Sequence, residues 1–403
     1  MSNENLEEKL VPEIRFKQYS EFWQKTKLSE ICNIQDGTHA TPTYVEAGVP
    51  FFSVDTIINN VPPKFISNEE HEKLIKRCNP KKGDILISRI TGGILGYSKL
   101  VDWDYEFSIY VSLALLSSIK INPRYLNQYL KTQYYRKDFL SKSLLIAVPP
   151  KINLNDLAKT EIKYPSLEEQ EKIAKFLELI DKKIELLEKK SQLINIEKEY
   201  YLHLFFNENT EFNLKSDLKK IKLENILSLQ GGFNFDSKSF DDTANNKVIK
   251  IGDIPNNLNL EKFNGNYSKQ NSGEKYEVKS GDILIALSGA TFGKSGKVSG
   301  NGFAFINQRV AKFNCEQCDS NYIFQLINSS KFKKYLNMLP TSSAQPNISN
   351  KDILNYSTFI PEINEQRKIG NLFNKIDNQI ELIDKQIYNI KKFKKGLLQK
   401  MFV

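Results

Sequence analysis

Two aspartates in matching surroundings are the first residues that could do chemistry. Asp84 and Asp282 each follow a glycine and precede the apolar run Ile-Leu-Ile. Such carboxylates could hold the metal ion of a nuclease, but an aspartate in a glycine turn usually closes that turn through hydrogen bonds to its own backbone. A second carboxylate with a following lysine does not recur at a fixed spacing from both. We therefore expect a structural role for Asp84 and Asp282.

One lysine lies in a segment similar to a phosphate-binding loop. Residues 288–295 read Ser-Gly-Ala-Thr-Phe-Gly-Lys-Ser and follow a predicted strand, which is the right context for Lys294 to bind a phosphate. However, Ser288 stands where the first glycine is required, and more glycines follow where a helix should begin. The corresponding segment of the first half, residues 90–98, has no lysine. The sequence therefore favours a glycine-rich loop of the fold over a nucleotide site.

Cysteine and histidine are too sparse for most metal or nucleophile chemistry. Cys315 and Cys318 make half of a zinc knuckle, and no second pair of ligands follows nearby. The chain has 3 histidines, of which His39 could equally contact a ligand or bond within its own turn-rich loop. The Gly-x-Gly-x-x-Gly fingerprint and the Asn/Asp-Pro-Pro-aromatic motif of amino-methyltransferases are absent. We predict no catalytic residue, no metal and no cofactor in this chain.

The composition favours a protein that binds a polyanion. Among 403 residues, 57 are Lys or Arg and 48 are Asp or Glu, which gives a formal charge of +9. The excess is moderate, and an AT-rich genome that uses Lys and Asn freely would produce it equally well. With 4 cysteines, a polar start and no apolar run long enough to span a bilayer, the sequence predicts a cytoplasmic protein with reduced thiols and no membrane partner.

These residues belong to two copies of one pattern. Residues 82–87 return as residues 280–285, an offset of 198, and the motif in residues 165–186 returns in residues 361–382, an offset of 196. Such a period is too long for a solenoid and indicates a duplicated set of domains. Each copy has short β-like runs broken by Gly, Pro and Asn, then a short helical piece, then a long helix. The predicted fold class is α+β: two similar mixed α/β domains separated by two long antiparallel coiled-coil helices, related by a pseudo-twofold repeat.

A heptad seam follows each globular part, with apolar residues alternately four and three apart. The predicted helix-pairing residues are Ile173, Leu177, Ile180, Ile184, Leu187, Ile369, Phe373, Ile376, Ile380 and Ile383. Lys198 and Lys394 interrupt the two seams at the same position of the repeat. A lone helix of this length cannot hide its apolar stripe, so we expect the two helices to pair. Antiparallel pairing would place one globular domain at each end.

Polar and basic loop side chains remain as candidates for a binding surface. Arg reads guanine and Asn or Gln reads adenine in the major groove of DNA, while Lys contacts phosphates. Taken alone, each of these residues is more often a solvated loop residue than a binding residue, but similar sets recur at equivalent places in both copies. The candidates are Thr38, His39, Arg89, Thr91, Tyr97, Ser98 and Lys99 in the first copy, and Ser288, Thr291, Lys294, Ser295, Lys297, Asn307, Gln308 and Arg309 in the second.

The ordered motifs resemble one known family over essentially the whole chain. The matching segments are residues 11–16, 36–42, 83–87, 165–174, 281–285, 361–370 and the ending 395–402. In this combination the chain resembles the specificity subunit of type I restriction-modification systems. The matching segments read Val-Pro-Glu-Ile-Arg-Phe, Asp-Gly-Thr-His-Ala-Thr-Pro, Gly-Asp-Ile-Leu-Ile, Pro…Glu-Glu-Gln…Ile-Ala, Gly-Asp-Ile-Leu-Ile, Pro…Asn-Glu-Gln…Ile-Gly and Lys-Gly-Leu-Leu-Gln-Lys-Met-Phe.

The resemblance implies a function and a division of the chain. Two target recognition domains, here residues 1–165 and residues 207–361 with a linker, would each read one half of a bipartite double-stranded DNA target. Helical regions at residues 166–206 and 362–403 would separate them and dock two modification subunits. Those subunits would methylate adenine N6 with S-adenosylmethionine, and restriction subunits would add translocation and cleavage driven by ATP, with Mg on the partners. Because residues 36–39 differ from residues 230–234, the half-sites should differ.

Two other functions stay open at this point. The chain could be a stand-alone nuclease or NTPase that uses Asp84, Asp282 or Lys294. It could also be a coiled-coil scaffold that binds only proteins.

Overall fold

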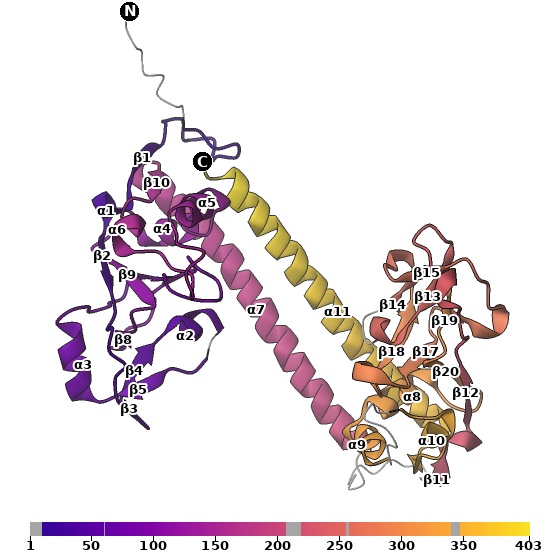
Figure 1. The fold of residues 1–403 in the computed structure, drawn as a ribbon. Coiled ribbons are helices and arrows are strands. Elements are labelled where there is room, and N and C mark those ends of the chain that lie inside the picture. The colour runs from indigo at the N-terminus through magenta and orange to yellow at the C-terminus, as the bar shows by residue number, and fades with distance from the viewer. Residues whose placement is uncertain (1–9, 60, 207–218, 255–257, 340–346) are drawn as a thin grey trace, which may run out of the picture. The chain divides into compact units, whose positions relative to one another are not determined.

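The computed structural model describes residues 10–59, 61–206, 219–254, 258–339 and 347–403, and Figure 1 shows its elements. Contacts divide the chain into two units, of which the first comprises Met1–Glu188 with Lys385–Val403, and the second Lys189–Asp384. Each unit therefore contains one globular domain and part of each long helix. The predicted linker after the first helix, residues 207–218, lies outside the described residues.

The first unit is built around an antiparallel sheet with the order β2-β9-β6-β7. Its central strand β6 carries the Ile-Leu-Ile run, and Ile85, Leu86 and Ile87 are all 0% exposed. Because both faces of this strand are covered, its apolar residues are continuous rather than alternating. The strands of this sheet are β2 (Asn33–Asp36), β6 (Ile85–Ser88), β7 (Ser98–Leu100) and β9 (Leu113–Ser117).

A second sheet with the order β3-β5-β4-β8 and a separate pair, β1 with β10, complete the strands of this unit. These strands are β1 (Gln24–Lys27), β3 (Tyr44–Val45), β4 (Val49–Phe52), β5 (Lys64–Ile66), β8 (Ser108–Ile109) and β10 (Glu161–Tyr164). The short helices are α1 (Leu28–Ile31), α2 (Val54–Asn59), α3 (Asn68–Ile75), α4 (Pro123–Tyr129), α5 (Gln133–Ser141) and α6 (Leu154–Leu157).

The second unit repeats this framework. Its larger sheet has the order β12-β20-β17-β18-β14, whose first four strands correspond to β2-β9-β6-β7, and its smaller sheet has the order β15-β13-β19-β16. A pair of β11 with β21 matches β1 with β10. The bounds are β11 (Lys219–Lys222), β12 (Leu227–Gly231), β13 (Asn246–Ile249), β14 (Leu258–Asn259), β15 (Asn266–Ser268), β16 (Glu277–Lys279), β17 (Ile283–Ala286), β18 (Ser295–Ser299), β19 (Phe303–Ile306), β20 (Val310–Cys315) and β21 (Ser357–Ile360).

The helices of the second unit follow the same order. They are α8 (Ser320–Asn328), α9 (Ser330–Met338) and α10 (Asn350–Leu354), with single 3-10 turns elsewhere in the unit. Equivalent residues begin α4 and α8, because the Asn122 side chain accepts a hydrogen bond from Tyr125 N at 3.0 Å and the Asp319 side chain accepts one from Tyr322 N at 2.9 Å. Both are N-caps of the usual kind. The duplication predicted from the sequence is therefore a duplication of fold.

Two long helices, α7 (Leu167–Phe206) and α11 (Ile363–Lys400), each begin in one unit and end in the other. In the first unit, Leu177 near the start of α7 shares a core with Leu397 near the end of α11. In the second unit, Phe206 at the end of α7 shares a core with Ile369 near the start of α11. Within each unit the helices are therefore antiparallel, as the fold class predicts. All ten predicted pairing residues, from Ile173 to Leu187 and from Ile369 to Ile383, are buried or half-buried.

Each long helix ends at or beside an aromatic residue that packs into the core of the unit where the helix ends. Phe402 is 1% exposed, and its ring lies 5.6 Å from the Tyr125 ring and 6.1 Å from the Trp23 ring. Its repeat equivalent Phe206 lies 5.3 Å from the Tyr322 ring. Residues 14 and 400 also meet in the first unit, where Ile14 N donates to Lys400 O at 2.9 Å.

Candidate nucleic-acid interface

A buried carboxylate organises the loop that follows β2. Asp36 accepts hydrogen bonds from Arg77 Nη2 at 2.6 Å, from Arg89 Nη1 at 3.1 Å and, on the same oxygen as Arg89, contacts His39 Nε2 at 3.0 Å. Burial raises the pKa of Asp36, but the hydrogen bonds from Arg77 and His39 and the charge of Arg89 outweigh it and hold that pKa below its usual value. The carboxylate therefore stays ionised at neutral pH and fixes the loop.

Arg89 differs from the sequence expectation of an exposed loop residue. It is 7% exposed, and besides Asp36 it donates to Val111 O at 3.0 Å and to Ile152 O at 3.3 Å. With Nε and Nη1 bonded in this way and the side chain buried, the guanidinium is not presented to a guanine base. Sequence spacing could not show this, because Asp36 lies 53 residues away. Arg89 is a structural residue of the first domain.

The other candidates of the first domain lie at its surface to different degrees. The His39 side chain is 62% exposed although it contacts Asp36, so it bonds within its own loop and still faces solvent. Lys99 lies on β7 with its Nζ 5.8 Å from the Trp103 ring centroid. Thr38, Thr91 and Tyr97 are half-buried. Burial raises the pKa of Tyr97, so its hydroxyl stays protonated and can donate a hydrogen bond.

The candidates of the second domain gather around the ends of β17, β18 and β19. Lys294, Gln308 and Arg309 are exposed, and Arg309 Nη1 donates to Asn347 Oδ1 at 3.3 Å. Ser288 forms a β-bridge with Asn347, and Thr291 Oγ1 donates to Ile251 O at 2.9 Å. Asn307, which is half-buried, makes a β-bridge with Phe233. These contacts bring loops that are distant in sequence to one edge of the domain.

Three further candidates lie on strands rather than on loops. Ser98 on β7 and Ser295 on β18 are 3% and 6% exposed. Ser295 Oγ accepts a hydrogen bond from Asn328 at 2.8 Å, and Lys297 Nζ donates to Asn321 of α8 at 2.5 Å. The sequence expectation that these three lie on binding loops is therefore wrong, since alternation along β7 and β18 turns them toward the helical side of each domain.

A glycine at the same place in each copy explains how the loops stay on a common framework. A Cβ on Gly37 would lie 2.0 Å from Ile109 O, and one on Gly232 would lie 2.1 Å from Asn307 O. Only glycine allows the loop backbone to come this close to the neighbouring strand. Thr38 and His39 follow Gly37, whereas Phe233 and Asn234 follow Gly232. The two domains therefore share the glycine that anchors the loop, but the residues that follow this glycine differ.

The two aspartates and the glycine-rich segment that could have done chemistry have structural roles in the fold. Asp84 Oδ2 accepts from Lys81 N at 2.8 Å, and Asp282 Oδ2 accepts from Lys279 N at 2.8 Å, so each closes the turn before its strand. The segment around Lys294 is a 3-10 turn at Gly289–Thr291 that leads into β18 rather than a helix. All four cysteines are free thiols, and the described residues contain no group of three His, Cys, Asp or Glu that could hold a metal ion.

The interruptions of the helical seams are ion pairs, one in each unit. Lys198 Nζ lies 2.7 Å from Asp377 Oδ1, and Lys394 Nζ lies 2.5 Å from Asp181 Oδ1. The second oxygen of each aspartate accepts a hydrogen bond at 2.9 Å from the globular domain, Asp181 from Gln128 of α4 and Asp377 from Gln325 of α8. Each aspartate therefore joins both long helices and a domain helix. The heptad spacing marks the two lysines as interruptions, but the aspartates and glutamines are visible in the sequence only as residues that recur in both copies, with no role assigned.

A second glutamine pair ties each domain to the start of a long helix. Gln170 accepts from Asn122 N at 2.9 Å and donates to Pro165 O at 2.8 Å. Its equivalent Gln366 accepts from Asp319 N at 3.0 Å and donates to Pro361 O at 2.8 Å. Both glutamines are buried. The Glu-Gln motif that follows each proline is therefore a structural junction.

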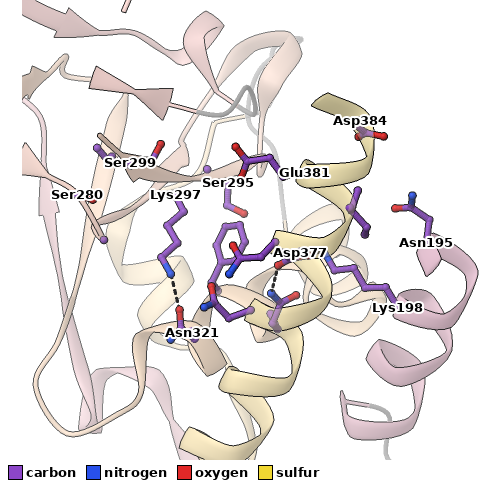
Figure 2. Close-up of a pocket in the computed structure, with 18 residues that line it drawn as sticks. Asn195, Lys198, Ser280, Ser295, Lys297, Ser299, Asn321, Asp377, Glu381 and Asp384 are labelled. Carbon is purple, nitrogen blue, oxygen red and sulfur yellow. Dashed lines mark hydrogen bonds and ion pairs between the residues drawn. The ribbon is translucent and has the colours of Figure 1, made fainter. Parts of the chain in front are cut away.

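In the second unit, Lys198, Gln325 and Asp377 line a pocket of about 810 Å³. Figure 2 shows Lys297 directed at Asn321, and Asp377 and Lys198 on the two long helices. Three carboxylates, Asp377, Glu381 and Asp384, line it against two lysines. A phosphate backbone would meet net negative charge there. The pocket is therefore a poor candidate for contact with nucleic acid.

Comparisons with solved structures find the same fold in other proteins. The crystal structure of a type I restriction-modification system S subunit from M. genitalium superposes with a TM-score of 0.66 at 15% identity, covering 98% of this chain and 99% of that one. A structure titled for complex assembly and conformational transition of the type I R-M system gives a TM-score of 0.55 at 16% identity over 93% of this chain and 96% of that one. At these identities the likeness shows the fold.

Sequence relatives point to the same class. The type I restriction enzyme MjaVIII specificity subunit of Methanocaldococcus jannaschii is 26% identical, over 88% of this chain and 85% of its own length. A putative type I specificity subunit of Mycoplasma pneumoniae is 23% identical, over 85% and 86%. The family model for the type I restriction modification DNA specificity domain matches twice, at residues 20–196 and 215–392. The chain belongs to this family. In the described part of the chain, no helix has the length and apolar character of a membrane span.

Proposed function

We propose that this chain is the DNA-recognition subunit of a type I restriction-modification complex and reads two different half-sites of a bipartite, asymmetric target. One observation carries the proposal. The two domains share their sheet order and their anchoring glycines, Gly37 and Gly232, while the residues that follow those glycines differ. A common scaffold with different loops is how one fold reads different sequences.

The reading surface would be formed by the exposed residues at the loop edge of each domain. In the second domain these include Lys294, Gln308 and Arg309, which could combine phosphate contacts with base contacts. In the first domain they would include the exposed His39, together with the half-buried Thr91 and Lys99. The net charge of +9 supports a polyanionic partner.

The outer face of α7 supports the docking of partner helices. Leu179 and Leu186 in the first unit are 62% and 56% exposed, and Leu193 and Tyr200 in the second are 58% and 62% exposed. These residues are seven apart, which is the spacing of a second coiled-coil seam. On α11, Leu382 is 61% exposed and is the repeat equivalent of Leu186. We assign these faces to two modification subunits.

The chemistry would belong to the partners. The modification subunits would use S-adenosylmethionine, and the restriction subunits would use ATP and Mg²⁺, in the cytoplasm. The structural roles of Asp84, Asp282 and the segment around Lys294 favour this assignment over a stand-alone nuclease or NTPase.

An experiment on the purified chain separates the three functions. The chain is titrated with duplex DNA at several salt concentrations and assayed for cleavage with Mg²⁺ and ATP. We expect an affinity that falls steeply with salt, because phosphate contacts release counterions, and we expect no turnover. Turnover that is lost in the Asp282→Asn variant would support the enzyme, and an absence of salt-dependent affinity would support the scaffold.

A further inference from the structure

The most exposed apolar side chains in the described part of the chain lie together on one loop of the first domain. Ile146 is 97% exposed and Val148 is 98% exposed, and Leu145 beside them is 53% exposed. Such exposure forgoes the stabilisation that burial of branched aliphatic side chains provides. An apolar tip of this kind indicates a surface that is buried against a partner.

The backbone holds this tip in a narrow, stiff loop. At its base, Leu144 N donates to Lys151 O at 2.7 Å and Lys151 N donates to Leu144 O at 3.2 Å, which makes an antiparallel bridge. Pro149 and Pro150 follow the tip, and each ring restricts the backbone. A loop that is closed by one antiparallel bridge and ends in an apolar tip is narrow enough to reach base edges in the major groove, which admits elements as wide as an α-helix.

The tip stands beside the loop that carries candidate reading residues. Thr91 N donates to Pro150 O at 3.1 Å, and Ile152 N donates to Arg89 O at 2.9 Å. Between residues 131 and 163 the sequence has seven Lys or Arg and three Asp or Glu. The segment that carries the tip is therefore net positive, which favours a nucleic acid as the occupant over an apolar protein face.

The two copies differ at this loop. Residues 144–150 read Leu-Leu-Ile-Ala-Val-Pro-Pro, whereas the corresponding residues 340–346 read Pro-Thr-Ser-Ser-Ala-Gln-Pro. Residues 340–346 lie outside the described part of the structure. A framework contact would be expected in both copies, whereas a contact that reads sequence need not be. The difference therefore favours a role in reading one half-site.

We propose that Ile146 and Val148 read thymine in the half-site of the first domain, by packing against the thymine 5-methyl group in the major groove. This group distinguishes thymine from the other bases there and has no hydrogen-bonding capacity, so an apolar side chain recognises it. The inference rests on the proposed DNA-reading function and names one part of its specificity.

The test uses the complex of this chain with its modification subunits. Its DNA is a set of duplexes that contain the sequence that the complex methylates. Each thymine of the target is replaced in turn by deoxyuridine, which removes only the methyl group. We expect the wild-type complex to bind about fourfold more weakly when deoxyuridine replaces thymine at one or more positions of one half-site. This factor is the value for a buried methyl group. Ile146→Ser or Val148→Ser should bind the thymine duplex more weakly by a similar factor and show no further loss with deoxyuridine.

Two readouts keep the test specific. The slope of log affinity against log salt should not change in these variants, because no phosphate contact is removed. The variant Val61→Ser is the matched control, since Val61 is 48% exposed in the same unit and lies in another loop. It should keep both the affinity and the sensitivity to deoxyuridine.

The outcomes are distinguishable from a failure of the proposed function. If the complex shows no salt-dependent DNA affinity, the DNA-reading function itself is wrong. If it binds DNA but the two serine variants respond to deoxyuridine as the unsubstituted complex does, the thymine contact is refuted. If the serine variants instead fail to assemble with the modification subunits, the tip is a protein-docking surface and the inference is overturned.

Discussion

Asp36 shows how much of this molecule is decided by single polar contacts. Its side chain is 7% exposed, and it receives two guanidinium groups, one from Arg77 and one from the buried Arg89. A buried carboxylate with these partners holds the loop of the first domain in one conformation. The same contacts remove Arg89 from the set of residues that could touch DNA.

We predict that Asp36→Asn lowers the free energy of unfolding at pH 7 by about 3 kcal/mol, because Arg89 is left buried without its counter-ion. The pKa of Asp36 is lowered in the folded protein. Its ionised form therefore stabilises the fold above the usual pKa of about 4, and this contribution is lost as pH falls through the lowered pKa. Urea unfolding of both proteins at pH 7 and pH 3 measures the difference.

The difference between the two proteins should shrink at pH 3. Asp102→Asn is the matched control, because Asp102 is an exposed aspartate of the same unit, and it should change stability little at either pH. A loss in Asp36→Asn that is the same at both pH values would show that ionisation of Asp36 does not stabilise the fold.

At the scale of elements, the pairs Lys198–Asp377 and Lys394–Asp181 link helices and domains at equivalent places. Each is a polar interruption of an apolar seam, and such residues set helix register at some cost in stability. Because each aspartate also accepts from a glutamine of its domain, the pair orients that domain on the helices within its unit. The repeat preserves all three side chains.

We predict that Asp377→Lys destabilises the second unit by about 2 kcal/mol, because two lysines then face each other and Gln325 loses its acceptor. The charge swap Asp377→Lys with Lys198→Asp should recover about half of this loss, since it restores the pair between the helices but not the acceptor. Chemical unfolding measures each variant. Combining Asp377→Lys with Lys375→Asp instead of Lys198→Asp should recover none of the lost stability. Equal recovery in the two double variants would refute a specific pair between Lys198 and Asp377.

The exposed leucines of the long helices give a second prediction at this scale. Leu186→Lys should remove one modification subunit from the complex, and Leu382→Lys should remove the other, because an interface anchor contributes about 2 kcal/mol or more. Native mass spectrometry of the co-expressed complex counts the subunits. Lys189→Ala changes an exposed residue near Leu186 and should leave both in place. Full assembly in the double leucine variant would exclude these faces as docking sites.

At the scale of the whole molecule, the sequence predicted the framework far better than the surface. The Gly-Asp-Ile-Leu-Ile repeat marks buried central strands because Ile85 and Ile283 are covered on both faces. The heptad spacing likewise marks apolar positions such as Leu177 and Phe373, which are 0% exposed. These signals are local, and residue types and spacing carry them.

Contacts between distant residues were not predictable in the same way. The burial of Arg89 depends on Asp36 and on the carbonyls of Val111 and Ile152, which only the fold brings together. The same holds for Gln128 and Asp181, which look like ordinary surface residues in the sequence. Loop residues therefore needed the structure before they could be assigned to a surface or to the interior.

The helical regions should set the spacing of the two half-sites. We predict that deleting residues 187–193 of α7 together with residues 383–389 of α11 shortens the spacer of the target by up to about three base pairs, because a heptad spans about 10 Å and a base step about 3.4 Å. The deletion retains both lysine–aspartate pairs. Sequencing of methylated sites in a strain that expresses the shortened chain measures the spacer. An unchanged spacer would show that the length of the helices does not set the distance between the half-sites.

The most direct measurement is the methylome of a strain that carries this chain with its modification subunits. Two domains with one framework and different loops predict a methylated motif of two different short sequences, separated by a spacer of fixed length in which any base is accepted. Loss of that motif when the chain is deleted would complete the result. A palindromic motif, or a continuous one without a spacer, would contradict the account.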